Sequence, residues 1–205
     1  MARDEERMAR SKEEPIVGSL PDAPGIRAAI GLTPKLGANL LGLADALLVD
    51  DYPGATISRG EREMLAEAVS AGNDCFFCMD SHAAHAGAVL EKHGETQLLP
   101  LLDDVKLGDF RRFGPKMRAL FKITRTVGRA PLQLTAADVA AAIDAGATDA
   151  DVQLAVVIAA GFSMYNRMVD GLRARTSPDV SVYRARAEQI AERGYAAPPV
   201  PAVAR

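Results

Sequence analysis

The sequence carries no excess of charge of one sign. It has 24 Lys and Arg against 27 Asp and Glu, a formal net charge of −3, and the two kinds are interspersed along the chain. A nucleic-acid-binding domain concentrates basic residues on one face. The balance therefore argues against a nucleic-acid partner.

Long apolar segments are also missing. The start, Met-Ala-Arg-Asp-Glu-Glu-Arg-Met, lacks the apolar stretch of a signal peptide, and no apolar run approaches the roughly 20 residues of a membrane span. We therefore expect a cytoplasmic protein with no membrane partner. In that compartment thiols are kept reduced, so a cysteine pair serves catalysis, redox sensing or metal binding more often than a structural disulfide.

Signals for strands and for common nucleotide or hydrolase sites are absent as well. We find no apolar alternation of period two, no Asn-Gly or Asp-Gly hairpin between apolar runs, no glycine-rich phosphate loop and no G-x-S-x-G elbow. Apolar residues instead recur at spacings of three and four. The sequence predicts an all-α fold.

Helix start and stop signals divide the chain. The helix ends are marked by proline in a first turn, by the capping box of Ser58 with Glu61, by Asn or Thr at other helix starts, and by glycines after apolar runs. The predicted helices cover 34–47, 58–72, 73–93, 116–127, 135–146, 148–172 and 181–193.

The composition indicates one domain. A chain of 205 residues that is 48% hydrophobic can bury one sizeable core, and nothing marks a second. Residues 1–15 are almost all charged or small, and we expect a disordered segment or an arm in an oligomer. Residues 196–205 are Ala, Pro and Val with a terminal Arg and are expected to be a flexible tail. The predicted domain is 16–195.

Both cysteines of the chain lie three residues apart, and a histidine follows. On a helix Cys75, Cys78 and His82 are one turn apart each and line one seam. Cys75, near the helix start, would gain thiolate character from free backbone amides, and His82 could take the proton of Cys78. We predict that Cys78 is the activated thiol and that Cys75 closes a disulfide.

The geometry of a helical hairpin adds Glu63 to the candidate site. If the chain reverses tightly at 72–73, Glu63 and His82 lie about ten residues on either side of the turn and face each other. The carboxylate could then orient the imidazole and relay its proton. The alternative is a solvated surface carboxylate, because Glu63 lies opposite the apolar face of its own helix.

Other interpretations of these residues stay open. The cysteines could be buried, inert thiols. Zinc bound by Cys75, Cys78, His82 and His85 is disfavoured, since these residues span about 15 Å of one helix. We expect His85 at a polar edge or beside the site and His93 as a cation at a helix end. Polar groups of Tyr165, Asn166 and Arg167 could join a pocket or bond between helices.

Three segments together resemble the alkylhydroperoxidase D family of the carboxymuconolactone decarboxylase superfamily, and its peroxidase-related branch in particular. They are residues 58–63 (Ser-Arg-Gly-Glu-Arg-Glu), residues 69–78 (Val-Ser-Ala-Gly-Asn-Asp-Cys-Phe-Phe-Cys) with His82, and residues 165–170 (Tyr-Asn-Arg-Met-Val-Asp). The resemblance implies a compact all-helical domain that assembles into dimers, trimers or hexamers. It also implies that Glu63, Cys75, Cys78 and His82 form a thiol peroxidase site.

The resemblance has one departure. The best-studied peroxidases of the family carry a histidine directly before the second cysteine, and here that position is Phe77. Decarboxylase members lack the cysteine pair, so lactone decarboxylation is not expected.

The expected function is a thiol-dependent peroxidase that needs no haem, flavin or metal. Its partners would be a hydroperoxide substrate and an external dithiol or thiol reductant protein. Two alternatives remain: a redox-sensing or thiol-exchange module with little peroxidase turnover, and a non-catalytic helical oligomer.

Overall fold

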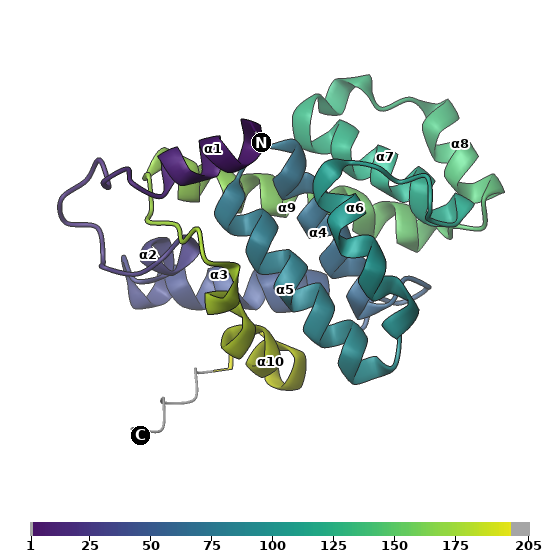
Figure 1. Cartoon of the computed structure of the whole chain (residues 1–205). Coiled ribbons are helices and arrows are strands. Elements are labelled where there is room, and N and C mark those ends of the chain that lie inside the picture. The colour runs from purple at the N-terminus through teal and green to yellow at the C-terminus, as the bar shows by residue number, and fades with distance from the viewer. Residues whose placement is uncertain (1, 198–205) are drawn as a thin grey trace.

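The computed structural model describes residues 2–197, and every regular element among them is helical (Figure 1). This confirms the predicted all-α class. The α-helices are α1 (Ala2–Arg10), α2 (Ile26–Ile30), α3 (Pro34–Leu48), α4 (Arg59–Gly72), α5 (Phe76–His93), α6 (Leu102–Leu107), α7 (Pro115–Arg129), α8 (Ala136–Asp144), α9 (Asp149–Gly171) and α10 (Arg184–Arg193). Short 3₁₀ segments are η1 (Thr96–Leu101), η2 (Pro131–Gln133) and η3 (Val180–Tyr183).

The capping signals explain where the helices begin. Ser58 with Glu61, Thr135 with Asp138 and Thr148 with Asp151 form reciprocal capping boxes at α4, α8 and α9. Thr33 caps α3, whose first residue is Pro34. The predicted starts of these four helices are confirmed because each depends on hydrogen bonds within one turn.

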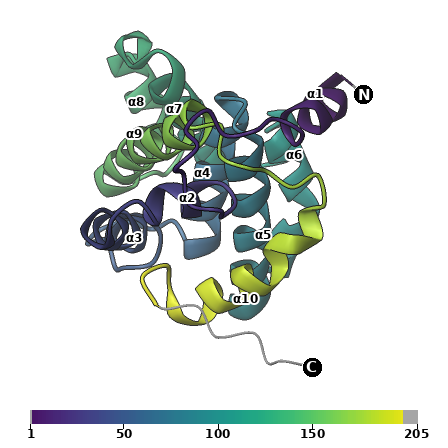
Figure 2. The same cartoon turned by 90° about the vertical axis from the view of Figure 1, so that its left-hand side faces the viewer.

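Helix α4 lies at the centre of the molecule. It packs against α5, α9, α7, α6 and α3, and Figure 2 shows α5, α9 and α3 around it. Every residue of 62–72 is buried as a result. A helix enclosed on all sides has no solvated face, so its apolar pattern does not tell which of its polar residues are exposed.

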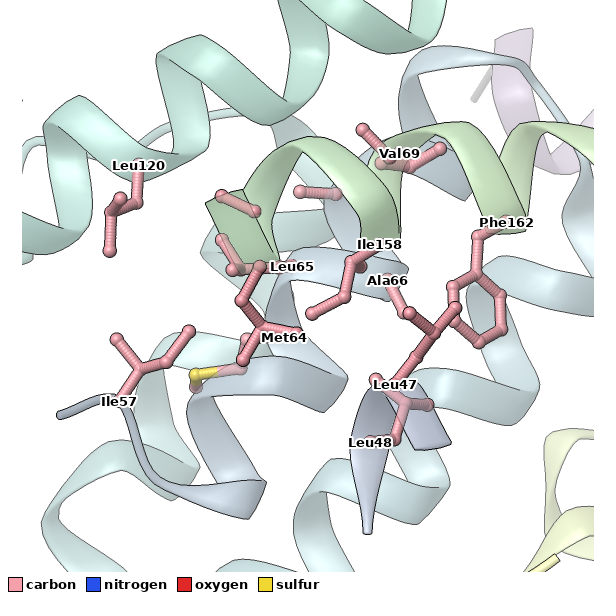
Figure 3. Packing of buried hydrophobic residues seen from close by; sticks show 14 of the residues in the cluster. Leu47, Leu48, Ile57, Met64, Leu65, Ala66, Val69, Leu120, Ile158 and Phe162 are labelled. Carbon is pink, nitrogen blue, oxygen red and sulfur yellow. The ribbon is translucent and has the colours of Figure 1, made fainter. Parts of the chain in front are cut away.

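The hydrophobic core fills the space between α3, α4, α7 and α9. Figure 3 shows Leu48 of α3, Leu65 of α4, Leu120 of α7 and Ile158 of α9 within this cluster. Each of these four side chains is fully buried. Helix α9 is the one helix of the described residues that is long and apolar enough to cross a membrane, but 56% of its most apolar stretch is buried inside the protein. Its packing is that of a core helix in a compact domain.

The turn between α4 and α5 differs from the prediction. Asn73 ends α4 instead of starting α5, and Cys75 is the N-cap residue of α5. Asp74 has a positive φ of 56°, which breaks the helical path, and the Cys75 amide donates to the Ser70 carbonyl at 3.0 Å. The tight reversal itself, which the pairing across the hairpin requires, is present.

The ends of the described chain pack on the domain. Helix α1 lies in the segment expected to be disordered or an arm in an oligomer, and its Arg7 and Arg10 pair with Asp80 and Asp170 at 3.2 and 3.1 Å. These ion pairs link segments far apart in sequence, which explains why local composition gave no sign of them. Most of the predicted tail, 198–205, lies outside the described residues.

Asp151 provides a test of the packing between α9 and the segment before α4. Its fully buried carboxylate accepts hydrogen bonds from the Thr56 amide and hydroxyl at 2.6 Å each, the Ile57 amide at 3.1 Å and the Thr148 amide at 3.0 Å. Burial alone would raise the pKa of Asp151, but these donors outweigh it and lower the pKa below its ordinary value.

We predict that Asp151→Asn lowers the free energy of unfolding by about 2 kcal/mol at pH 7, because the amide NH₂ group must face backbone donors. A depressed folded-state pKa stabilises the fold at pH above the ordinary value of 3.8, and this contribution is lost as the pH falls through the folded-state pKa. Urea unfolding at pH 7 and pH 3 measures both effects. Asp149→Asn, at an exposed position in the same helical turn, is the control; an equal loss there would contradict the assignment.

Candidate functional site

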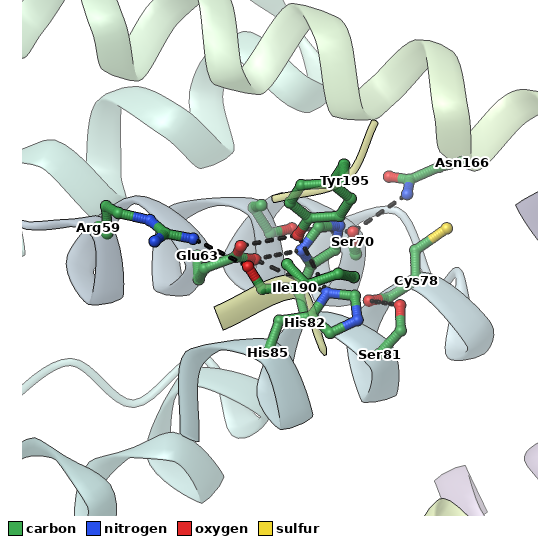
Figure 4. A network of polar contacts seen from close by, with 11 residues as sticks. Arg59, Glu63, Ser70, Cys78, Ser81, His82, His85, Asn166, Ile190 and Tyr195 are labelled. Carbon is green, nitrogen blue, oxygen red and sulfur yellow. Dashed lines mark hydrogen bonds and ion pairs between the residues drawn. The ribbon is translucent and has the colours of Figure 1, made fainter. Parts of the chain in front are cut away.

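Glu63 and His82 meet across the α4–α5 hairpin. Glu63 Oε2 lies 2.8 Å from His82 Nδ1 (Figure 4). Glu63 is 1% exposed, so the solvated alternative for this residue is wrong. The error comes from treating α4 as a surface helix with one apolar face, whereas its neighbours enclose it on all sides.

Tyr195 completes the hydrogen bonding of this carboxylate. Its hydroxyl donates to Glu63 Oε1 at 2.7 Å. Gly194, with a φ of 79°, turns the chain after α10, and the Tyr195 amide donates to Asp45 of α3 at 2.5 Å. Tyr195 could not be found from the sequence, because 132 residues separate it from Glu63 and no local motif marks it.

These donors keep Glu63 ionised. Burial alone would raise the pKa of Glu63, but the hydrogen bond and charge interaction with His82, the nearby His85 and the hydrogen bond from Tyr195 outweigh burial and lower it. Burial and the adjacent carboxylate raise the pKa of Tyr195 well above its ordinary value, so the phenol keeps its proton. The pair is a carboxylate with a phenol donor.

His85 joins the same network. Its Nδ1 lies 3.0 Å from the Tyr195 oxygen, and burial lowers the pKa of His85 to about 3, which keeps the imidazole neutral. Because the one phenol proton goes to Glu63, Nδ1 of His85 must carry a proton and donate to Tyr195. The expectation that His85 lies beside the site agrees with this position.

The same proton count fixes the tautomer of His82. A carboxylate only accepts, so Nδ1 of His82 carries the proton in its bond to Glu63. The nitrogen left to take part in proton transfer on this ring is Nε2. The buried carboxylate thus fixes the orientation of the His82 ring, which lies at 86° to the Phe162 ring with 4.5 Å between the centroids.

The two cysteines are in contact but differ in their surroundings. Both are free thiols, with Sγ atoms 3.0 Å apart. Burial, Cys78 and the charge of Asp170 raise the pKa of Cys75 well above its ordinary value. The expectation that the helix start favours a Cys75 thiolate is therefore wrong, because desolvation of this buried cap position outweighs the helix dipole.

A cavity of about 590 Å³ opens beside the network. Cys78, Ser81, His82 and His85 of α5 line one wall, and Cys75 is not among the lining residues. In Figure 4 the Cys78 sulfur points away from the Glu63 network. The remaining walls, from α2, α3, α9 and the segment around α10, are mostly apolar.

Phe77 packs against neighbouring segments, at the position where the best-studied peroxidases of the family that the sequence resembles carry a histidine. Its ring meets Tyr183 edge-on at 5.5 Å between centroids. A Cβ on Gly25 would lie 2.3 Å from the Phe77 ring, so only glycine fits there. Phe77 thereby holds the segment before α2 against α5 and forms part of the cavity wall.

One group among the described residues has metal-ligand geometry. Ligand atoms of Glu63, His82 and His85 lie within 4.8 Å of one another. Their hydrogen bonds to each other and to Tyr195 account for the cluster, and both imidazole Nδ1 atoms serve as donors in them. The cysteines are not part of this group.

The late polar residues take separate roles. Asn166 donates to Ser70 Oγ at 3.0 Å and accepts from Asn73 at 2.9 Å, so it bonds α9 to α4. Tyr165 donates to the Leu40 carbonyl at 2.6 Å, and its ring lines the cavity. Exposed His93 lies in the last turn of α5, where the dipole favours a cation.

Neither a protein-family model nor a curated protein matches this sequence. The solved structures that are similar to this chain include two that match over most of their length. One is the alkylhydroperoxidase AhpD core of an uncharacterized peroxidase-related protein from Ralstonia eutropha JMP134, with 26% identity, a TM-score of 0.63, and coverage of 81% of this chain and 82% of that one.

The other solved structure is an uncharacterized peroxidase-related protein from Silicibacter sp. TM1040. It has 22% identity and a TM-score of 0.67, and the match covers 84% of this chain and 95% of that one. Both share the fold of this chain and are described as peroxidase-related. The chain thus has the all-helical fold of alkylhydroperoxidase D-like, peroxidase-related proteins, and the resemblance seen in the sequence is confirmed.

Proposed function

We propose that the protein is a thiol-dependent peroxidase that reduces organic hydroperoxides through a disulfide cycle of Cys75 and Cys78. The observation that carries this proposal is the placement of Cys78. Its Sγ lies 3.0 Å from that of Cys75, and it lines the same cavity as His82, whose Nδ1 is hydrogen-bonded to buried Glu63. A thiol, a base, an orienting carboxylate and a substrate space are together in one site.

The first step oxidises Cys78. His82 Nε2 takes the thiol proton, and the thiolate attacks the terminal oxygen of the hydroperoxide. A sulfur–oxygen bond forms as the O–O bond breaks, and the alkoxide that leaves takes the proton from His82 to become an alcohol. Cys78 becomes a sulfenic acid, and the two electrons it loses reduce the peroxide.

The second step closes the disulfide. The Cys75 sulfur attacks the sulfenic sulfur of Cys78, and hydroxide leaves and takes the Cys75 proton to form water. An external dithiol then supplies two electrons and two protons. Cys78 lines the cavity and Cys75 does not, so the reductant attacks Cys78 and releases Cys75 as the leaving group.

The proposal extends to partners that follow from the resemblance. These are an external dithiol or thiol reductant protein and further copies of this chain in a homo-oligomer. The proposed location of the protein is the cytoplasm, where such reductants act.

The order of attack can be tested with the two serine variants. We predict that Cys78→Ser abolishes peroxide consumption with dithiothreitol as reductant. Cys75→Ser should still form a sulfenic acid at Cys78, which stalls or overoxidises because the resolving thiol is missing. Dimedone trapping with peptide mapping detects it; a sulfenic acid at Cys75 in the wild type would reverse the roles.

The relay can be tested by amide substitution. We predict that Glu63→Gln and His82→Gln each slow single-turnover peroxide reduction by roughly 10²- to 10⁴-fold, and that the double variant is little worse than either one. The amide removes the charge that orients His82 but keeps the size of the side chain. Stopped-flow measurement of thiol oxidation gives these rates.

Glu67→Gln is the matched control for this test. Glu67 is a second fully buried carboxyl, one turn after Glu63 on α4, and neither of its oxygens has a hydrogen-bond partner in the described structure. Burial raises its pKa well above the ordinary value, so the amide removes no charge. We expect a near-wild-type rate for this variant. Equal losses in Glu63→Gln and Glu67→Gln, or full activity in Glu63→Gln, would contradict the relay.

A further inference from the structure

The cavity beside Cys78 is much larger than hydrogen peroxide requires. Its volume of about 590 Å³ falls within the roughly 300–1,000 Å³ of pockets that bind drug-sized ligands. Apolar side chains from four elements line it, among them Ile26, Ile30, Leu40, Leu41, Phe162 and Ile190. Such walls favour a ligand with an extended hydrocarbon part.

The charges at this cavity have one sign. Arg27 of α2 and Arg186 of α10 both line it, and no Asp or Glu does. Neither guanidinium has a carboxylate within ion-pair distance among the described residues, in contrast to Arg184, which pairs with Glu188 at 3.1 Å. The cavity therefore joins a hydrocarbon-lined interior to two cations that have no carboxylate within ion-pair distance among the described residues.

Arg186 is held in place rather than free in solvent. It is half-buried, and its Nη2 donates to the Tyr195 carbonyl at 2.9 Å. Burial lowers its pKa, and the positive charge of Arg27 lowers it further, so the two cations repel each other. A bound anion would relieve this repulsion, and a planar carboxylate matches the guanidinium donors.

We propose that this cavity binds an amphiphilic monocarboxylate, with its carboxylate on Arg27 and Arg186 and its aliphatic chain along the apolar walls toward Cys78. Resting on the peroxidase function proposed above, the substrate is then the hydroperoxide of an aliphatic carboxylic acid. The bound carboxylate determines which carbon atoms of the ligand's aliphatic chain lie beside the Cys78 thiol. The hydroperoxide group lies on the chain, away from the carboxylate.

The binding half of this proposal can be tested without turnover. The probes are saturated carboxylates of six to twelve carbons and the alcohols of the same lengths, titrated calorimetrically into the reduced protein. We expect the dissociation constant to fall about 4-fold per added CH₂, as for burial of about 0.8 kcal/mol per group. We expect each carboxylate to bind at least 10-fold more tightly than its alcohol.

The arginine variants test the headgroup contact. Arg27→Gln with Arg186→Gln should weaken decanoate binding at least 10-fold and leave decanol binding unchanged. Arg184→Gln, on the same helix but exposed and paired with Glu188, is the matched control and should change neither. Equal binding of acid and alcohol to the wild type would overturn the proposal, as would parallel losses of both ligands in the folded double variant.

A second measurement uses only the wild type. Decanoate should slow alkylation of Cys78 by iodoacetamide at concentrations that match its dissociation constant, and decanol should need higher ones. Unchanged alkylation at saturating decanoate would overturn the placement beside Cys78. Turnover of tert-butyl hydroperoxide without decanoate binding would refute this inference alone, whereas decanoate binding without consumption of any hydroperoxide would refute the peroxidase.

Discussion

The site depends on one interaction, the hydrogen-bonded contact between the Glu63 carboxylate and His82 in the middle of the fold. Burying an ionised carboxylate away from water costs several kcal/mol of folding free energy unless hydrogen-bond donors replace its hydration. His82 at 2.8 Å and Tyr195 at 2.7 Å are those donors. The arrangement therefore requires the α4–α5 hairpin and the segment after α10 to be in place together.

A neighbouring carboxyl shows what the donors contribute. Glu63 and Glu67 are one turn apart on α4 and equally buried. Burial raises the pKa of Glu67 well above its ordinary value, and its oxygens lack hydrogen bonds in the described structure, whereas the donors around Glu63 lower its pKa. The same side chain in the same helix thus becomes a neutral acid or a carboxylate according to its partners.

The two thiols also differ because of their surroundings. Their sulfurs lie 3.0 Å apart, yet Cys78 borders the cavity and Cys75 is enclosed. The left-handed turn at Asp74 puts Cys75 at the cap of α5, where burial raises its pKa. In the proposed cycle, access from the cavity favours attack by Cys78, and enclosure suits Cys75 to resolve the sulfenic acid without competing for peroxide.

Much of this could be predicted from the sequence, because the signals involved are local. The capping boxes at Ser58, Thr135 and Thr148 act within one helical turn and set the helix starts. Apolar spacings of three and four, without strand signals, indicate the all-α class. The spacing of Cys75, Cys78 and His82 follows from helical geometry. The pairing of Glu63 with His82 needs only a tight turn between two helices. Counting about ten residues on either side of that turn therefore predicts it.

Only the tertiary structure decided the burial of Glu63, the role of Tyr195 and the character of the cavity. Glu63 is buried because helices from distant parts of the chain enclose α4, a fact that its own apolar pattern cannot contain. Tyr195 is 132 residues from Glu63 in sequence, and the turn at Gly194 and the hydrogen bond of its amide to Asp45 position it beside the carboxylate. Arg27 and Arg186 come from opposite ends of the chain and line the same cavity. Contacts at such separations leave no periodicity or spacing in the sequence, since they arise only when the helices pack.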